Sequence, residues 1–243
     1  MRIAVAGATG NIGARAVAVL QRDGHDVVRI SRSFGVDLLT GDGLDEALSG
    51  VQTVLDVTNG PPASFGPTTT NLLAAAHRAG VGHHVLLSIV GIRHIADNAH
   101  YAGKREQERL VAGGPVPWTI VPATQFHDFA EMTVRRSERD GVATVAPLLM
   151  QPIAPQDVAE ILAEIATGPP RGRYLDVAGP ETQDLVDLAR RTLAKRGRPV
   201  KLVPTWAGVY GLSMAGNALL PAADARIAPT TFDEWLDALP PAS

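Results

Sequence analysis

The stretch Ile3-Ala4-Val5-Ala6-Gly7-Ala8-Thr9-Gly10-Asn11-Ile12-Gly13 decides the fold of this chain. A short apolar run of this kind is typical of a buried strand, and the glycines after it permit a tight turn. An apolar stripe continues along residues 14–20, Gly24 ends the predicted helix, and residues 27–30 have the pattern of a second strand. The sequence therefore predicts a strand, a crossover helix and a parallel strand.

The glycine turn also predicts a binding site. Backbone N–H groups at the start of a helix carry the positive end of the helix dipole, so they favour an anion. In such a unit the expected anion is the pyrophosphate of a dinucleotide, although the spacing here is Gly-x-x-Gly-x-x-Gly rather than Gly-x-Gly-x-x-Gly. The expected cofactor contacts in this turn are Gly7, Thr9, Gly10, Asn11 and Ile12.

The composition narrows the class of protein. With 243 residues, 45% of them hydrophobic and 19% charged, the chain is suited to one α/β domain with a modest second lobe. The net charge of -3 argues against a nucleic-acid partner, which usually demands a basic patch. No cysteine is present, and the seven histidines show no metal-binding pattern, so we expect no metal.

The chain also lacks the signs of a membrane or secreted protein. No apolar run approaches the roughly 20 residues of a membrane span. Because the first strand is predicted to begin at residue 3, we expect no signal peptide. We expect a cytoplasmic protein that acts on a small-molecule substrate without a membrane partner, and its oligomeric state stays open.

Apolar runs alternate with helical patterns through the first half of the chain. Strands are expected at residues 3–6, 27–30, 51–57, 84–90 and 118–121, and further helices at about 69–79 and 101–112. This alternation is typical of the α/β class, with a doubly wound parallel sheet of the Rossmann type.

The second half is less regular. Helices are expected at 157–167, 185–195 and 232–239, and strands at 173–177 and 200–203. We expect the strand at 173–177 to return to the sheet. The predicted organisation is a Rossmann domain at 1–124, with returning segments near 150–178, and a smaller substrate-binding lobe mainly within 125–243.

The end of the second strand indicates which dinucleotide binds. NAD-binding units usually place an acidic residue about 20 positions after the glycine motif, where it bonds the ribose 2′-hydroxyl. This chain has Ser31-Arg32-Ser33 there instead. A guanidinium suits a 2′-phosphate, so we expect NADP as the cofactor, with contacts at Arg32 and Ser33. The alternative for Arg32 is a solvated side chain at a strand end.

Together these residues resemble the atypical short-chain dehydrogenase/reductase superfamily, in particular its NmrA-like and NAD(P)H-binding group. The resemblance covers most of the chain and rests on the glycine motif, the basic end of the second strand, Lys104 with Glu108, and residues 86–91, 116–120, 156–160 and 231–236. The cofactor contacts that it implies are Asp37 and Leu38 near the adenine, the backbone at Val57, Thr58 and Asn59, and Lys104 at the nicotinamide ribose.

Reductases of this superfamily use a serine, a tyrosine and a lysine four residues after that tyrosine. The resemblance implies that Ser88 positions the substrate oxygen. His100 lies four residues before Lys104, whereas Tyr101 lies only three before it. Residues three and four apart share a helix face, so either side chain is a candidate proton donor. Packing or solvent exposure is the alternative for both, and capping of local backbone is the alternative for Ser88.

A substrate pocket is expected just after the strand at 118–121. Polar groups there would bond a substrate and aromatic rings would enclose it, unless the phenylalanines pack in the core. The candidate residues are Gln125, Phe126, His127 and Phe129. The sequence thus favours an NADP(H)-dependent oxidoreductase that reduces a small carbonyl, enone or quinone-like compound. Two alternatives stay open: an NADP(H)-sensing regulatory protein without turnover, and a redox-neutral isomerase or dehydratase.

Overall fold

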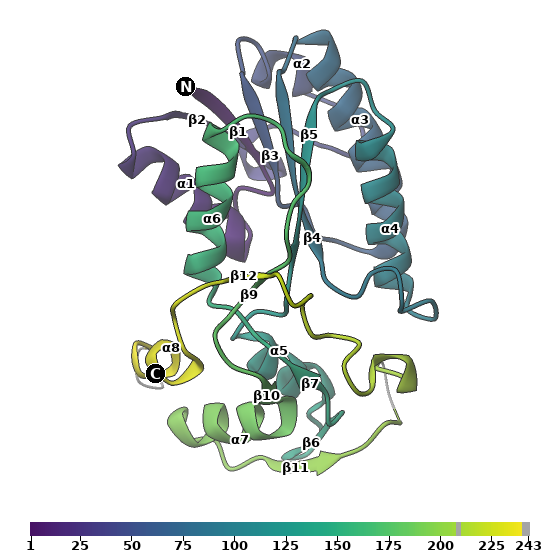
Figure 1. The fold of residues 1–243 in the computed structure, drawn as a ribbon, viewed down its shortest axis with the longest axis vertical. Coiled ribbons are helices and arrows are strands. Elements are labelled where there is room, and N and C mark those ends of the chain that lie inside the picture. The colour runs from purple at the N-terminus through teal and green to yellow at the C-terminus, as the bar shows by residue number, and fades with distance from the viewer. Residues whose placement is uncertain (208–209, 240–243) are drawn as a thin grey trace.

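A parallel sheet forms the centre of the molecule (Figure 1). The computed structural model describes residues 1–207 and 210–239, and within them eight strands run in the order β12-β9-β5-β4-β3-β1-β2, with β8 also beside β5. Their bounds are β1 (Arg2–Ala6), β2 (Asp26–Ile30), β3 (Thr53–Asp56), β4 (His83–Ile89), β5 (Trp118–Ala123), β8 (Gly172–Arg173), β9 (Val177–Ala178) and β12 (Arg226–Ile227). The doubly wound parallel sheet predicted from the sequence is confirmed.

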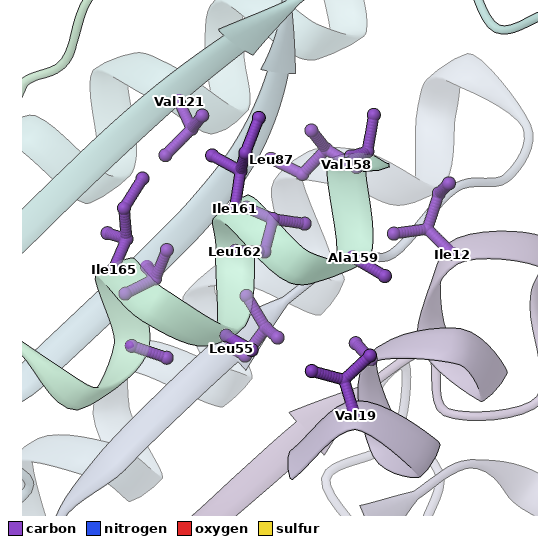
Figure 2. Packing of buried hydrophobic residues seen from close by; sticks show 14 of the residues in the cluster. Ile12, Val19, Leu55, Leu87, Val121, Val158, Ala159, Ile161, Leu162 and Ile165 are labelled. Carbon is purple, nitrogen blue, oxygen red and sulfur yellow. The ribbon is translucent and has the colours of Figure 1, made fainter. Parts of the chain in front are cut away.

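Helices cover both faces of the sheet. Helices α1 (Asn11–Arg22) and α6 (Pro155–Thr167) lie on one face, and α3 (Phe65–Arg78) and α4 (Ala99–Ala112) lie on the other, with the short α2 (Leu44–Ala47) before β3 (Figure 1). Apolar residues of α6 lie against Leu55, Leu87 and Val121 of the sheet (Figure 2). Because α6 packs beside α1, residues from both halves of the chain build one core.

A smaller lobe lies beyond the carboxyl ends of β4 and β5 (Figure 1). It contains α5 (Phe129–Ser137), α7 (Leu185–Lys195), α8 (Phe232–Asp237), the parallel pair β6 (Val142–Val145) and β11 (Lys201–Pro204), and the antiparallel pair β7 (Leu149–Met150) and β10 (Gln183–Asp184). It has its own apolar core, on which Ile89 at the end of β4 packs. The edge of the sheet where ligands bind in such folds therefore faces this lobe.

Most predicted elements are present, with shifted ends. The exceptions are one predicted strand that is interrupted and several elements of the smaller lobe that were not predicted. The expected strand at 173–177 does return to the sheet, yet it is interrupted. Three residue steps along β5, from Ile120 to Ala123, match four steps on the partner, from Arg173 to Val177. The extra residue is a bulge that breaks the ladder into β8 and β9. Helix α5 and the short strands of the smaller lobe lack the periodicity that predicts them.

None of the helices in the described ranges is both long enough and apolar enough to cross a bilayer.

Candidate functional site

The glycine turn brings the start of α1 close to the ends of β1 and β3. Gly7 has a φ of +84°, and a Cβ added there would lie 3.1 Å from the carbonyl oxygen of Val57. A Cβ on Gly13 would lie only 2.1 Å from the carbonyl oxygen of Gly7. Both positions therefore require glycine, the first for its backbone conformation and the second for close packing.

The first turn of α1 is open to an anion. Gly10 occupies the N-cap position, no side chain caps the helix, and the first turn contains no acidic residue. Thr9, Gly10 and Asn11 are exposed, whereas the side chain of Ile12 is buried and leaves only its backbone N–H for a ligand. Free N–H groups over a cradle that only glycine can form fit a diphosphate group.

The segment after β2 adjoins this cradle. The N–H of Gly7 donates to the carbonyl of Ile30 at 3.0 Å, so Arg32 and Ser33 follow closely along the same edge. Both are exposed on a 3-10 turn. The hydroxyls of Ser31 and Ser33 lie 2.8 Å apart. Arg32 is therefore accessible to a 2′-phosphate.

The other predicted cofactor contacts lie along two loops. Asp37 accepts a hydrogen bond from the N–H of Leu39 at 2.7 Å, and the carbonyl of Leu38 accepts one from Asn71 at 3.0 Å. Val57 and Thr58 are half-buried beside Gly7, and Asn59 is exposed. The side chain of Asp37 thus orders its own loop, and the backbone after β3 forms one wall of the cradle.

Ser88 is an unusual buried hydroxyl near the end of β4. It is 1% exposed, and its Oγ has no hydrogen-bond partner among the residues that the structure describes. Buried polar groups normally have a hydrogen-bond partner, so the hydroxyl of Ser88 is suited to a partner that a ligand provides.

Tyr101 and His100 lie in the first turn of α4. Tyr101 is 7% exposed, and within the described chain its hydroxyl is hydrogen-bonded by Gln125 alone, at 3.4 Å. Burial raises the pKa of Tyr101 above its ordinary value. The ring of His100 is half-buried against Phe65, 5.4 Å between centroids. Burial and the nearby Lys104 lower the pKa of His100, which keeps its imidazole neutral near pH 7.

Lys104 points toward the sheet rather than toward Tyr101. Its Nζ donates to the carbonyl of Leu87 at 2.8 Å and to Oε1 of Gln107 at 2.5 Å. Burial lowers the pKa of Lys104 to about 8, although Asp56 and Glu108 oppose the shift. An ammonium has three N–H donors, so one is left for a ligand.

The predicted substrate residues separate into two groups. Gln125 lies beside Tyr101, and its Oε1 is buried with no partner in the described ranges. Phe126 packs against the core of the sheet, and Phe129 lies 5.6 Å from Tyr210 in the smaller lobe.

His127 faces away from the site. It is 1% exposed, its ring lies 5.4 Å from Phe232 and 5.5 Å from Trp235, and its Nε2 lies 3.2 Å from the carbonyl oxygen of Thr230. Of the four candidates, Gln125 is the one whose side chain hydrogen-bonds a predicted catalytic residue in the described chain.

Three residues beside the site were not singled out from the sequence. Asp56 is buried at the end of β3, Gln107 bonds both Asp56 and Lys104, and Asp128 accepts a hydrogen bond from Asn11 at 2.6 Å. The sequence contained a signal for Asp56, because a lone charged residue in an apolar strand is rarely buried without a partner. Gln107 lies three residues after Lys104 and shares its helix face.

Comparison with known proteins identifies the group to which these features belong. The sequence profile of the family described as NAD(P)H-binding matches residues 7–169. No curated protein matches the chain.

Solved structures share the fold across nearly the whole chain. MoeE5 in complex with UDP-glucose and NAD has a TM-score of 0.77 and 18% identity, covering 98% of this chain and 96% of that one. A nucleoside-diphosphate-sugar epimerase from Staphylococcus aureus has a TM-score of 0.70 and 19% identity, covering 97% and 99%. The NADPH-dependent quinone oxidoreductase QOR2 from Escherichia coli has a TM-score of 0.67 and 17% identity, covering 97% and 98%. Identities this low show a common fold.

Proposed function

Because the chain belongs to the NAD(P)H-binding family, we propose that it is an NADP(H)-dependent oxidoreductase that reduces a small carbonyl, enone or quinone-like compound. A quinone-like acceptor is the best fit. The observation that carries this choice is that Lys104 is withdrawn from Tyr101. Lys104 bonds Leu87 and Gln107, while the hydroxyl of Tyr101 is bonded by Gln125.

The choice of NADP rests on the residues after β2. Arg32 is exposed beside the cradle, and this edge has no acidic side chain where a ribose 2′-hydroxyl is usually bonded. A guanidinium and the adjacent serine hydroxyls would bind a 2′-phosphate through charge-assisted hydrogen bonds.

The residues of the site suit hydride transfer to an acceptor that needs little help with its proton. When bound, NADPH supplies the hydride. The unpartnered hydroxyl of Ser88 would orient the acceptor oxygen, and the remaining N–H of Lys104 would hold the nicotinamide ribose. A buried tyrosine with a raised pKa and a neutral histidine are weak acids, so a proton from Tyr101 or His100 would be slow to arrive.

The class of acceptor follows from the weak acidity of Tyr101 and His100. Reduction of a ketone leaves a strongly basic alkoxide that requires a positioned acid. Hydride transfer to a quinone leaves a phenolate. The pKa of the corresponding phenol resembles the value of about 10 for tyrosine, so water can protonate the phenolate.

Loss of NADPH absorbance with matched panels of quinones, enones and ketones tests the proposal. We expect turnover with quinones, and Tyr101→Phe and His100→Ala should retain it within about threefold, since neither residue must deliver a proton quickly. Ketone reduction that Tyr101→Phe abolishes would overturn the preference for quinones and restore the tyrosine as the acid.

The position of Lys104, bonded to Leu87 and Gln107, also favours a second candidate function, an NADP(H)-sensing regulatory protein without turnover. A lysine that is withdrawn from Tyr101 suits binding without proton transfer. Micromolar NADPH binding by fluorescence titration together with no oxidation across all three panels would select this function.

A further inference from the structure

A cluster of buried polar side chains lies at the carboxyl end of β3, next to two of the predicted cofactor contacts. Asp56, His84, Lys104 and Gln107 are each at most 4% exposed, and Thr58 is half-buried beside them. The cluster joins the loop after β3 to helix α4. These are the two segments that flank the candidate nicotinamide end of the site.

The carboxylate of Asp56 is the centre of this cluster. Its Oδ1 accepts from the backbone N–H of Thr58 at 3.0 Å and from the hydroxyl of Thr58 at 2.6 Å. Its Oδ2 accepts from Nε2 of Gln107 at 3.1 Å and lies 3.6 Å from Nε2 of His84. One carboxylate therefore bonds both the loop after β3 and helix α4, and it also lies close to His84 of strand β4.

Gln107 links this carboxylate to Lys104. A carboxylate can only accept and an ammonium can only donate, so the amide must turn its nitrogen to Asp56 and its oxygen to Lys104. The observed bonds have this polarity, with Gln107 Oε1 2.5 Å from Lys104 Nζ. The amide nitrogen also donates to the hydroxyl of Thr58 at 3.1 Å.

Charge explains why the relay matters. The two direct acceptors of the Lys104 ammonium, Leu87 and Gln107, are neutral, and a buried cation without a counter-charge is unfavourable. Burial alone raises the pKa of Asp56, but His84, Thr58 and Lys104 together bring it below its ordinary value, so Asp56 is ionised at neutral pH. Asp56 is thus the buried counter-charge, one hydrogen-bonded residue away.

We propose that Asp56 is a positioning residue of this site, which holds Lys104 charged and in place through Gln107 and shapes the cofactor-facing loop through Thr58. The proposal rests on the proposed function for its link to NADPH, but its first consequence concerns the cofactor-free protein. If Asp56 acts as described, removing its charge must make Lys104 easier to deprotonate.

The charged and titratable groups that face Lys104 limit what else can cause such a change. They are Asp56 on β3 and His100 and Glu108 on α4 itself, and His84 on β4 lies 3.6 Å from Asp56. Substitution of Asp56 leaves the other three in place, so a shift in the titration of Lys104 reports on Asp56.

The sequence makes Lys104 easy to observe. It contains three lysines, Lys104, Lys195 and Lys201. In protein labelled with ¹³C-lysine, Lys104→Met identifies the Cε signal of Lys104, and the other two lysines serve as internal controls far from Asp56. We expect Lys104 to titrate near the value of about 8 that its burial produces. In Asp56→Asn its midpoint should fall by about one unit.

A relocated charge provides the rescue. In the double variant Asp56→Asn, Gln107→Glu, the carboxylate contacts Lys104 directly and the new asparagine can donate to it. The Lys104 titration should return to the wild-type value or above. NADPH affinity, measured by fluorescence titration, should fall about tenfold in Asp56→Asn and recover in part in the double variant.

The control is a buried hydrogen bond on the opposite face of the same sheet, because adjacent strand residues such as His83 and His84 point to opposite faces. Thr119→Val removes the hydroxyl that lies 2.8 Å from Nε2 of His83, so it should lower thermal stability without moving the Lys104 titration. If Asp56→Asn does not fold, Gln107→Met interrupts the relay while Asp56 stays in place, and the Lys104 midpoint should again fall.

An unchanged Lys104 midpoint in folded Asp56→Asn would overturn the proposal and leave Asp56 a structural residue. This outcome is separate from the fate of the proposed function. If wild-type protein fails to bind NADPH, the function falls, whereas the lysine titration in cofactor-free protein still tests the relay.

Discussion

Single residues determine what this site can accept. Gly13 has no side chain where a Cβ would lie 2.1 Å from the carbonyl oxygen of Gly7, so the start of α1 can pack closely on the glycine turn. Ser88 has a buried hydroxyl without a partner in the described chain, and Lys104 uses two of its donors inside the protein. Ser88 and Lys104 are suited to a ligand because of where the fold places them.

Arg32 provides the residue-scale prediction. Arg32→Glu should weaken NADPH binding roughly 10- to 100-fold and NADH binding far less, because the lost charge-assisted hydrogen bonds reach only the 2′-phosphate. Fluorescence titration with both cofactors measures the ratio. Arg139→Glu makes the same charge change on an exposed turn of the smaller lobe and should leave both affinities unchanged. Equal losses of NADPH and NADH would remove Arg32 from the 2′-phosphate site.

At the scale of elements, a hydrogen bond joins the two lobes beside the diphosphate cradle. Asn11, the first residue of α1, donates to Asp128, the N-cap of α5, at 2.6 Å, and Arg15 donates to the carbonyl oxygen of Asn11 at 2.7 Å. Burial raises the pKa of Asp128, and Arg15 opposes the shift. The carboxylate of Asp128 thus lies near the positive end of α1, where it would repel an anionic ligand.

We therefore expect Asp128→Asn to strengthen NADPH binding at neutral pH by roughly three- to tenfold, since it removes a negative charge near the diphosphate. The raised pKa means that the wild-type carboxyl is protonated earlier as the pH falls, so the two affinities should converge in acid. Titrations at several pH values measure this. Glu131→Gln, on the same helix, should have little effect. Weaker binding by Asp128→Asn would show that the carboxylate assists the site.

At the scale of the whole molecule, the sheet is held together by buried groups far from the site. His83 lies at the start of β4, with Nδ1 3.1 Å from the carbonyl oxygen of Gly168 and Nε2 2.8 Å from the hydroxyl of Thr119. The carbonyl can only accept, so Nδ1 carries the proton and Nε2 accepts from Thr119. Burial lowers the pKa of His83 to about 4. The folded protein therefore keeps this ring neutral.

A loss of stability in acid follows. The unfolded chain binds a proton at His83 below its ordinary pKa of about 6.5, whereas the folded chain resists it, so stability present above that pH is lost as the pH falls toward 4. The contribution is on the order of 2 to 3 kcal/mol. Thermal unfolding at several pH values measures how stability depends on pH. The slope of stability against pH should differ between wild type and His83→Gln across this range, and the exposed variant His94→Gln should follow the wild type. Parallel slopes for all three proteins would contradict the assignment.

The sequence by itself determined the α/β fold and the cofactor cradle, because both depend on local chemistry. The apolar periodicity of each segment predicts strand or helix, and the glycine turn needs neighbours only a few residues away. The helix at residues 185–195 was predicted with the bounds that α7 has, and the positions of Gly7, Gly10 and Arg32 along one edge follow from the crossover unit.

The tertiary structure alone decided which groups the longer side chains contact. Lys104 bonds Leu87 and Gln107 instead of approaching Tyr101, His127 packs against α8, and Asp56 meets a glutamine 51 residues later in the chain. The bulge between β8 and β9 depends on the register of β5. Apart from the bond between Lys104 and Gln107, these contacts join residues distant in sequence. The free energy of burying charge and filling space, which no local pattern encodes, selects among the alternatives.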